Sequence, residues 1–157
     1  MTTHDDPQPA SYVVEPGGGE PIERQQVHIK ASTALTGGQA SVMEVVNPGF
    51  GGPPLHIHRR HGEMCYVVEG EYLFQFGDEI ITAPAGTFGY AAPGVRHTFA
   101  SVGKVSGRLL IIGVPSGLET YVRELDRLLA EGASEAAIKQ LGDAWDTELV
   151  GPPLALA

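Results

Sequence analysis

The stretch that decides the fold is residues 51–70, GGPPLHIHRRHGEMCYVVEG. His56 and His58 lie two residues apart, and because successive side chains of a strand alternate, both imidazoles leave the same face. Glu63 follows across residues 59–62, where the chain can turn and begin the next strand. The two imidazoles can therefore hold one ion, and Glu63 can face the same interior.

A fourth candidate donor comes from a later part of the chain. His97 follows the turn residues 93–96 (PGVR), which would bring it in from a distant strand. Three neutral imidazoles and one carboxylate suit Fe, Mn, Co, Ni, Cu or Zn rather than calcium. We therefore expect one divalent transition metal per chain, of unspecified identity.

Working outward, the chain forms a series of short expected strands. Segments of four to eight residues, rich in β-branched and aromatic residues, are separated by turn residues. Gly77-Asp78 predicts a hairpin, since glycine can supply a positive φ. The series favours an antiparallel barrel or jelly roll. The expected strands are residues 11–14, 25–32, 40–47, 55–59, 63–69, 72–76, 79–83, 88–91, 97–102 and 108–114.

Two helices are expected after the strands. Ser116 precedes Glu119 by three residues in a capping-box arrangement, and an apolar stripe at helical spacing follows from Leu118 to Leu129, which we interpret as packing. A second helix is expected from Ser134. The expected organisation is a mobile N-terminus (residues 1–10), a barrel (residues 11–115) and a helical extension packed on the barrel (residues 116–157).

Composition excludes several classes of protein. The 157 residues suit one domain, and 19 acidic against 10 basic residues give a net charge of −9, which would repel nucleic acid. One cysteine excludes an intrachain disulfide framework. No cationic start precedes an apolar run, and no run approaches 18 apolar residues. We expect a cytoplasmic protein with no membrane or nucleic-acid partner.

The spacing of histidines and glycines resembles the two motifs of the cupin superfamily. His56-x-His58, Glu63 and Gly70 match the first motif, and Gly94-x-x-His97 matches the second. Residues 51–70 are similar to those of small bacterial single-domain cupins that look like quercetin 2,3-dioxygenases. The resemblance implies an all-β jelly-roll barrel with two C-terminal helices. It also implies a metal held by His56, His58, Glu63 and His97, with Glu63 as catalytic base.

Strand parity predicts a mainly apolar pocket beside these ligands. Such a pocket suits an aromatic or polyketide-like small molecule. His61 lies among arginines and a glycine, so we expect it to be a solvated turn residue rather than a competing ligand. The residues expected to line the pocket are Met43, Val45, Cys65, Val67, Phe88, Tyr90 and Phe99.

Three functions follow as hypotheses. The resemblance favours a metal-dependent dioxygenase acting on an aromatic or enolic small molecule. The same donors would serve a non-redox polyketide cyclase or isomerase, in which the metal is only a Lewis acid. A non-catalytic small-molecule-binding cupin is the third. Because many related cupins pair through sheet edges, we also expect a homodimer.

Overall fold

The computed structural model describes residues 10–156 except 48, 50 and 104. The expectation of a mobile N-terminus falls on residues that, apart from Ala10, lie outside the described part. The helices are α1 (Thr33–Thr36), α2 (Leu118–Ala130) and α3 (Glu135–Ala144). The strands are β1 (Glu20–Ile22), β2 (Val27–Ala31), β3 (Ser41–Asn47), β4 (His56–His58), β5 (Gly62–Glu69), β6 (Glu71–Phe76), β7 (Glu79–Pro84), β8 (Phe88–Ala91), β9 (His97–Ser101), β10 (Gly107–Val114) and β11 (Thr147–Leu149).

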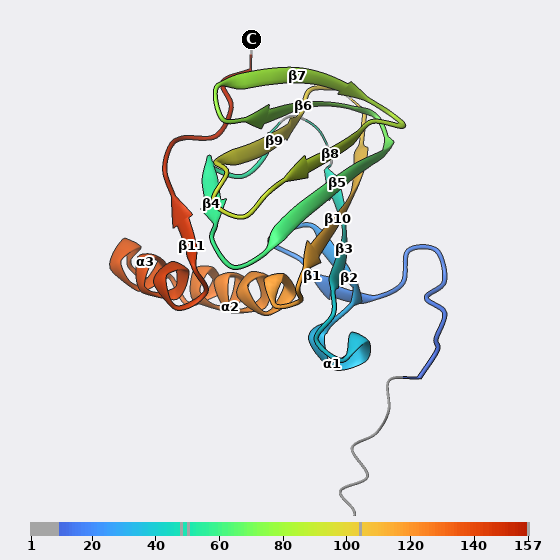
Figure 1. The fold of residues 1–157 in the computed structure, drawn as a ribbon, viewed down its shortest axis with the longest axis vertical. Coiled ribbons are helices and arrows are strands. Elements are labelled where there is room, and N and C mark those ends of the chain that lie inside the picture. Colours follow the sequence, from blue (N-terminus) through green and yellow to red (C-terminus); the bar gives the residue numbers. More distant parts are fainter. Residues whose placement is uncertain (1–9, 48, 50, 104, 157) are drawn as a thin grey trace, which may run out of the picture.

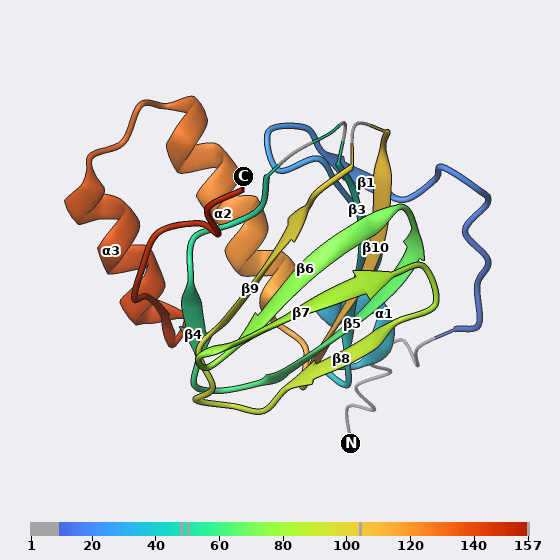
Figure 2. The ribbon, with the colours of Figure 1, turned by 90° about the horizontal axis from the view of Figure 1, so that it is seen from above.

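The strands form two antiparallel sheets that face each other. One sheet has the order β1-β2-β3-β10-β5-β8, and the other has the order β11-β4-β9-β6-β7. Figures 1 and 2 show α2 and α3 gathered on one side of the strands, next to β4 and β11. The expected antiparallel all-β architecture with two C-terminal helices is confirmed.

The core lies between the two sheets. Buried and less buried residues alternate along β2 and β10 because successive side chains point to opposite faces. Val67, Tyr72 and Leu109 are fully enclosed. Burying one such apolar side chain contributes about 1.5–3 kcal/mol, so the alternation holds the two sheets together.

Two glycines occupy positions where a turn or a close approach of the backbone requires glycine. Gly77 has a φ of 60° in the hairpin between β6 and β7, as the sequence predicts. Gly52 lies against β9, where a Cβ atom would come 1.7 Å from the carbonyl oxygen of Phe99. A glycine at this position therefore allows the chain to run along β9 before it enters β4.

Several elements differ from the expectations. Residues 11–14 lie outside any strand, and Val13 is 86% exposed. Strand β1 forms instead, from residues partly expected to be a turn, because it pairs with β2. Helix α1 and strand β11 were not expected either. Both are too short to carry a periodic signal.

The two expected helix starts have different outcomes. Ser134 caps α3, and its hydroxyl accepts from the backbone N–H of Ala137 at 3.2 Å. Helix α2 begins after Gly117, which provides no side-chain cap, so the expected capping role of Ser116 is wrong. No helix in the described part of the chain is long and apolar enough to cross a membrane.

Candidate metal centre

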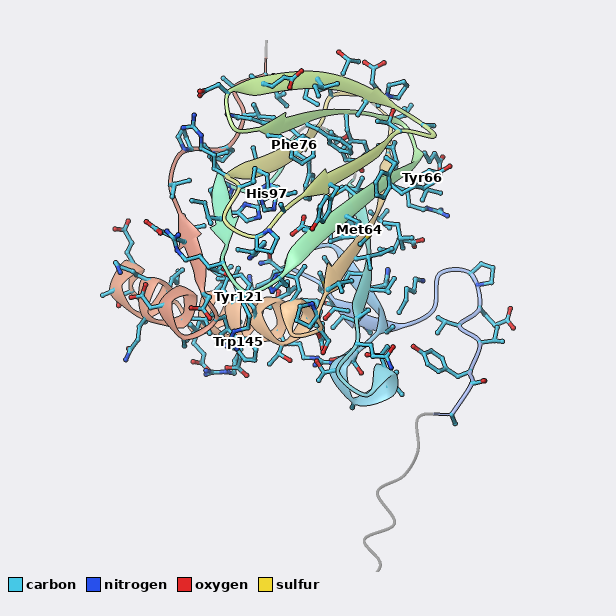
Figure 3. All side chains as sticks on the ribbon, viewed as in Figure 1. Met64, Tyr66, Phe76, His97, Tyr121 and Trp145 are labelled. Carbon is cyan, nitrogen blue, oxygen red and sulfur yellow. The ribbon has the colours of Figure 1, made fainter. Side chains whose placement is uncertain are left out.

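The fold brings together the four candidate ligands that the sequence predicts. His56 and His58 lie on β4, Glu63 near the start of β5, and His97 at the start of β9, where it pairs directly with His56. All four side chains are buried, and one donor atom of each lies within 4.8 Å of the others. Figure 3 shows His97 inside the barrel, among the strands that carry the other three.

Backbone carbonyls orient two of the imidazoles. His56 Nδ1 lies 2.7 Å from the carbonyl oxygen of Pro54, and His97 Nδ1 lies 2.9 Å from that of Val95. Because a carbonyl oxygen only accepts, both Nδ1 atoms must carry the proton and donate it. Each Nε2 atom therefore keeps a free lone pair, which is the arrangement of metal-binding histidines.

The Nε2 atoms of His58 and His97 lie beside a carboxylate. Oε2 of Glu63 lies 3.2 Å from His58 Nε2 and 3.5 Å from His97 Nε2. His97 Nε2 is buried without a hydrogen-bond partner among the described residues. Several acceptors facing one another in a buried site repel unless a cation lies between them. The residues therefore fit one transition-metal ion.

The protonation states of His56 and Glu63 agree with this fit. Burial lowers the pKa of His56 to about 4, which keeps it neutral at pH 7. Burial alone would raise the pKa of Glu63, but the His58 and His97 imidazoles beside its carboxylate outweigh this effect and bring the pKa well below its usual value. A neutral imidazole and an ionised carboxylate are the forms that bind metal.

A residue that the sequence analysis missed orients the third imidazole. Thr147 Oγ1 lies 2.9 Å from His58 Nδ1, and both residues are buried. Strand β11 places it there, because Thr147 pairs directly with His58 on β4. The hydroxyl is a partner for the imidazole nitrogen that points away from the cluster.

His61 is not the solvated turn residue expected from the sequence. Its side chain is 5% exposed, and its ring stacks on His58 with centroids 4.5 Å apart and planes 30° apart. The neighbouring Arg59 and Arg60 point outward and form ion pairs with acidic residues at the start of β11 and just before it. His61 does not belong to the cluster of donor atoms within 4.8 Å of one another.

The comparisons with known proteins agree with this geometry. Residues 42–113 match the model of the cupin domain, Cupin_2, and this range includes all four candidate ligands. This stretch of the chain is a cupin domain. None of the curated protein sequences compared with this cupin matches it.

Solved structures share the fold at low sequence identity. KdgF from Halomonas sp. is 18% identical with a TM-score of 0.61, over 71% of this cupin and 98% of that chain. A predicted oxalate decarboxylase from Thermotoga maritima is 19% identical with a TM-score of 0.55, over 57% of this cupin and 78% of that chain. A Klebsiella pneumoniae protein with a double-stranded β-helix domain is 21% identical with a TM-score of 0.52, over 66% and 84% of the two chains.

A cavity of about 600 Å³ opens onto the cluster in this cupin. Met43, Val45 and Phe99 line it together with His56, His58 and Glu63, as strand parity predicts. Cys65 and Val67 are buried in the core but do not line the cavity. The Cys65 thiol lies 3.6 Å from Glu63 Oε1.

Two residues expected in the pocket lie elsewhere. Phe88 and Tyr90 are 60% and 53% exposed, on the outer face of β8. The inward positions of this strand are Gly89 and Ala91. The parity assigned to β8 was therefore wrong by one residue, which moves every side chain of a strand to the other face.

Helix α2 forms another wall of the cavity. The apolar stripe was interpreted as packing alone, yet it also lines the cavity. The helical spacing of the stripe was visible in the sequence. The sequence does not show which strands the stripe packs against, because that depends on how the strands are arranged in the barrel. The residues of α2 that line the cavity are Leu118, Tyr121, Val122, Leu125 and Leu129.

Proposed function

We propose that this cupin is a metal-dependent enzyme, namely a dioxygenase acting on an aromatic or enolic small molecule. One observation carries the proposal: three histidines and a glutamate, all buried, lie at a largely apolar cavity of about 600 Å³. Cavities of about 300–1,000 Å³ accommodate small organic ligands. A site with polar donors at one place and apolar walls elsewhere favours a flat, mainly apolar substrate with an oxygen at the reacting end.

The walls of the cavity would hold the substrate and exclude water. Met43 and Phe99 from the sheets and Tyr121 from α2 face the same space. Contact with these side chains removes apolar substrate surface from water, at about 25 cal/mol per Å². The body of the substrate would be held in this way while its oxygen points toward the cluster.

Glu63 is the residue that would take a proton. Its low pKa keeps it ionised at neutral pH, and its Oε2 atom lies 3.2 Å from His58 Nε2 and 3.5 Å from His97 Nε2. An acidic enol or phenol hydroxyl in the cavity could transfer its proton to this carboxylate. A bound transition metal would supply Lewis acidity and, if redox-active, electron exchange with dioxygen.

The test is oxygen uptake by protein loaded with single metals. We expect the Fe, Mn, Co or Ni form to consume dioxygen in proportion to a flavonol or polyketide phenol, and the Zn form to be much slower. Glu63→Gln should lose most of the turnover while keeping much of the metal, because an amide oxygen can coordinate but accepts no proton at neutral pH. His61→Ala, which removes a side chain outside the donor cluster, serves as the control for metal content.

Other outcomes point to other chemistry at the same site. Anaerobic turnover at an undiminished rate, or a Zn form as fast as the others, would contradict the dioxygenase and favour a cyclase or isomerase. Tight binding of these compounds without turnover in any metal form would favour a non-catalytic binding protein.

A further inference from the structure

An exposed arginine is among the residues that line the cavity away from the metal centre. Residues 24–26, in the turn between β1 and β2, line the cavity, and Arg24 is the one arginine or lysine among its described lining residues. Glu23 and Asp126 share a second surface depression with Arg24. In the described part of the chain, Arg24 forms no ion pair with either of them. Its five guanidinium donors are therefore available to a ligand.

Strand register gives the separation, along the strand direction, between the turn that carries Arg24 and the metal centre. Glu63 pairs with Gly113, which in turn pairs with Ser41 at the start of β3. Val27, which directly follows the turn, pairs with Val45, four residues further along β3. At the rise of a strand, four residues correspond to about 13 Å.

Helix α2 gives a similar separation along its own axis. Leu118 packs on Gly113, where an added Cβ atom would lie 3.2 Å from the Leu118 Cβ. Asp126, which lines the depression with Arg24, comes eight residues later on α2. At 1.5 Å per residue this separation is about 12 Å. The two routes place Arg24 and Glu63 at opposite ends of the cavity.

The wall between the two ends is apolar. Met43 and Val45 come from β3, and Tyr121, Val122 and Leu125 come from α2. A ligand that contacts both ends of the cavity and the wall between them therefore needs an apolar middle and a polar group at each end.

We propose that the cavity selects an amphipathic organic anion, whose carboxylate binds Arg24 while its other end faces Glu63 at the opposite end of the cavity. Arginine recognises carboxylates through paired, charge-assisted hydrogen bonds. The chemistry at the far end rests on the proposed function, whereas binding of the anion by Arg24 does not require the metal.

The test compares two probes that differ only in charge, 6-phenylhexanoate and 6-phenylhexanamide. Their dissociation constants are measured by calorimetry on chelator-treated and on metal-loaded full-length protein. We expect the acid to bind about tenfold more tightly than the amide, in line with a charge-assisted hydrogen bond. Arg24→Gln should remove this preference and leave the affinity for the amide unchanged. Arg108→Gln, an exposed arginine 3.8 Å from Glu69 on β5, should change neither.

The inference is overturned if the acid preference persists in Arg24→Gln, or if the wild type binds neither probe or prefers the amide. Its failure is distinguishable from failure of the proposed function. Metal-dependent turnover without an acid preference contradicts only the role of Arg24. An acid preference that depends on Arg24, in protein that shows no turnover, contradicts only the proposed function.

Discussion

At the scale of single residues, Thr147 controls the orientation of one candidate ligand. Its hydroxyl is a hydrogen-bond partner of His58 Nδ1 at 2.9 Å. Thr147→Val keeps the shape of the side chain but removes this partner. We expect the affinity for metal to fall about 10–100-fold, as for other residues that orient metal-binding histidines.

The measurement is a competition titration against a chromophoric chelator. Glu148→Gln, at the next position of β11, changes an exposed side chain that pairs with Arg59 and should leave the affinity unchanged. An unaltered metal dissociation constant in Thr147→Val would show that His58 needs no such partner.

His61 contributes to stability rather than to metal binding. Its ring is buried and stacks on His58, so His61→Ala leaves a space beside the cluster. We expect the free energy of unfolding to fall by about 1–3 kcal/mol, against less than about 0.5 kcal/mol for the exposed Arg60→Ala. Urea unfolding of the metal-free proteins measures both. Equal stability of the two variants would contradict the packing role of His61.

Some residue positions could be predicted from the sequence and others could not. The two-residue spacing of His56 and His58 decides that they share a face, whatever surrounds the strand. The burial of His61 depends on how the turn after β4 packs against β10. The residues next to His61 in the sequence do not indicate this packing. The outward position of Phe88 depends on the register of β8 against β5, which is a tertiary property.

At the scale of elements, Glu119 joins α2 to two other parts of the fold. One carboxylate oxygen accepts from the backbone N–H and the hydroxyl of Thr33, both at 2.6 Å. The other accepts from the Ser41 hydroxyl and, at 3.1 Å, from the N–H of Gly117. This carboxylate therefore holds the start of α2 against α1 and β3.

The environment of Glu119 predicts an acid-dependent loss of stability. Burial alone would raise the pKa of Glu119, but hydrogen bonds from Ser41 and Thr33 outweigh it and lower this pKa below 4.5. The unfolded chain therefore binds the proton first as the pH falls. The stabilisation by Glu119 is complete above about pH 4.5 and is lost as the pH falls through the lower pKa of the folded state.

Glu119→Gln should lower the free energy of unfolding at pH 7 by about 1.5–3 kcal/mol and flatten its decrease between about pH 5 and 3. Urea unfolding at several pH values provides the measurement. Glu124→Gln, on the same helix but exposed and paired with Arg127, is the matched control. A pH profile of Glu119→Gln that parallels the wild type would contradict this role.

The longer elements were predictable because their patterns are local. Alternation marks β3, β5, β6 and β10, and helical spacing marks α2. By contrast, β1 and β11 have three residues each and exist because a partner strand lies beside them. Since β11 carries Thr147, the part of the site that the sequence analysis missed is the part supplied by such an element.

At the scale of the whole molecule, the outer face of the larger sheet predicts self-association. Tyr66 and Phe88 pair directly across β5 and β8, and Tyr90 pairs with Met64. Tyr66, Phe88 and Tyr90 are 44%, 60% and 53% exposed. Covering these aromatic rings would remove apolar surface from water, which favours association. We propose that a second copy of this chain covers the face.

Sedimentation velocity tests this proposal. We expect a dimer of the wild type at micromolar concentration and a monomer of Phe88→Glu, because the added charge would lie in the interface. Ile80→Glu, on β7 of the other sheet and 54% exposed in the wild type, should remain a dimer. A monomeric wild type, or a dimeric Phe88→Glu, would refute the assignment of this face.

The claim on which the whole account depends is that His56, His58, Glu63 and His97 hold one metal ion. Its most direct test is elemental analysis of protein purified without added metal, with thermal unfolding in the presence and absence of chelator. We predict about one transition-metal ion per chain, lost in His56→Ala, and a chelator-induced decrease of the Tm in the wild type alone, since a ligand at a thousandfold excess over its Kd stabilises by about 4 kcal/mol. A His56→Ala variant with full metal occupancy and the same chelator-sensitive Tm would contradict the account.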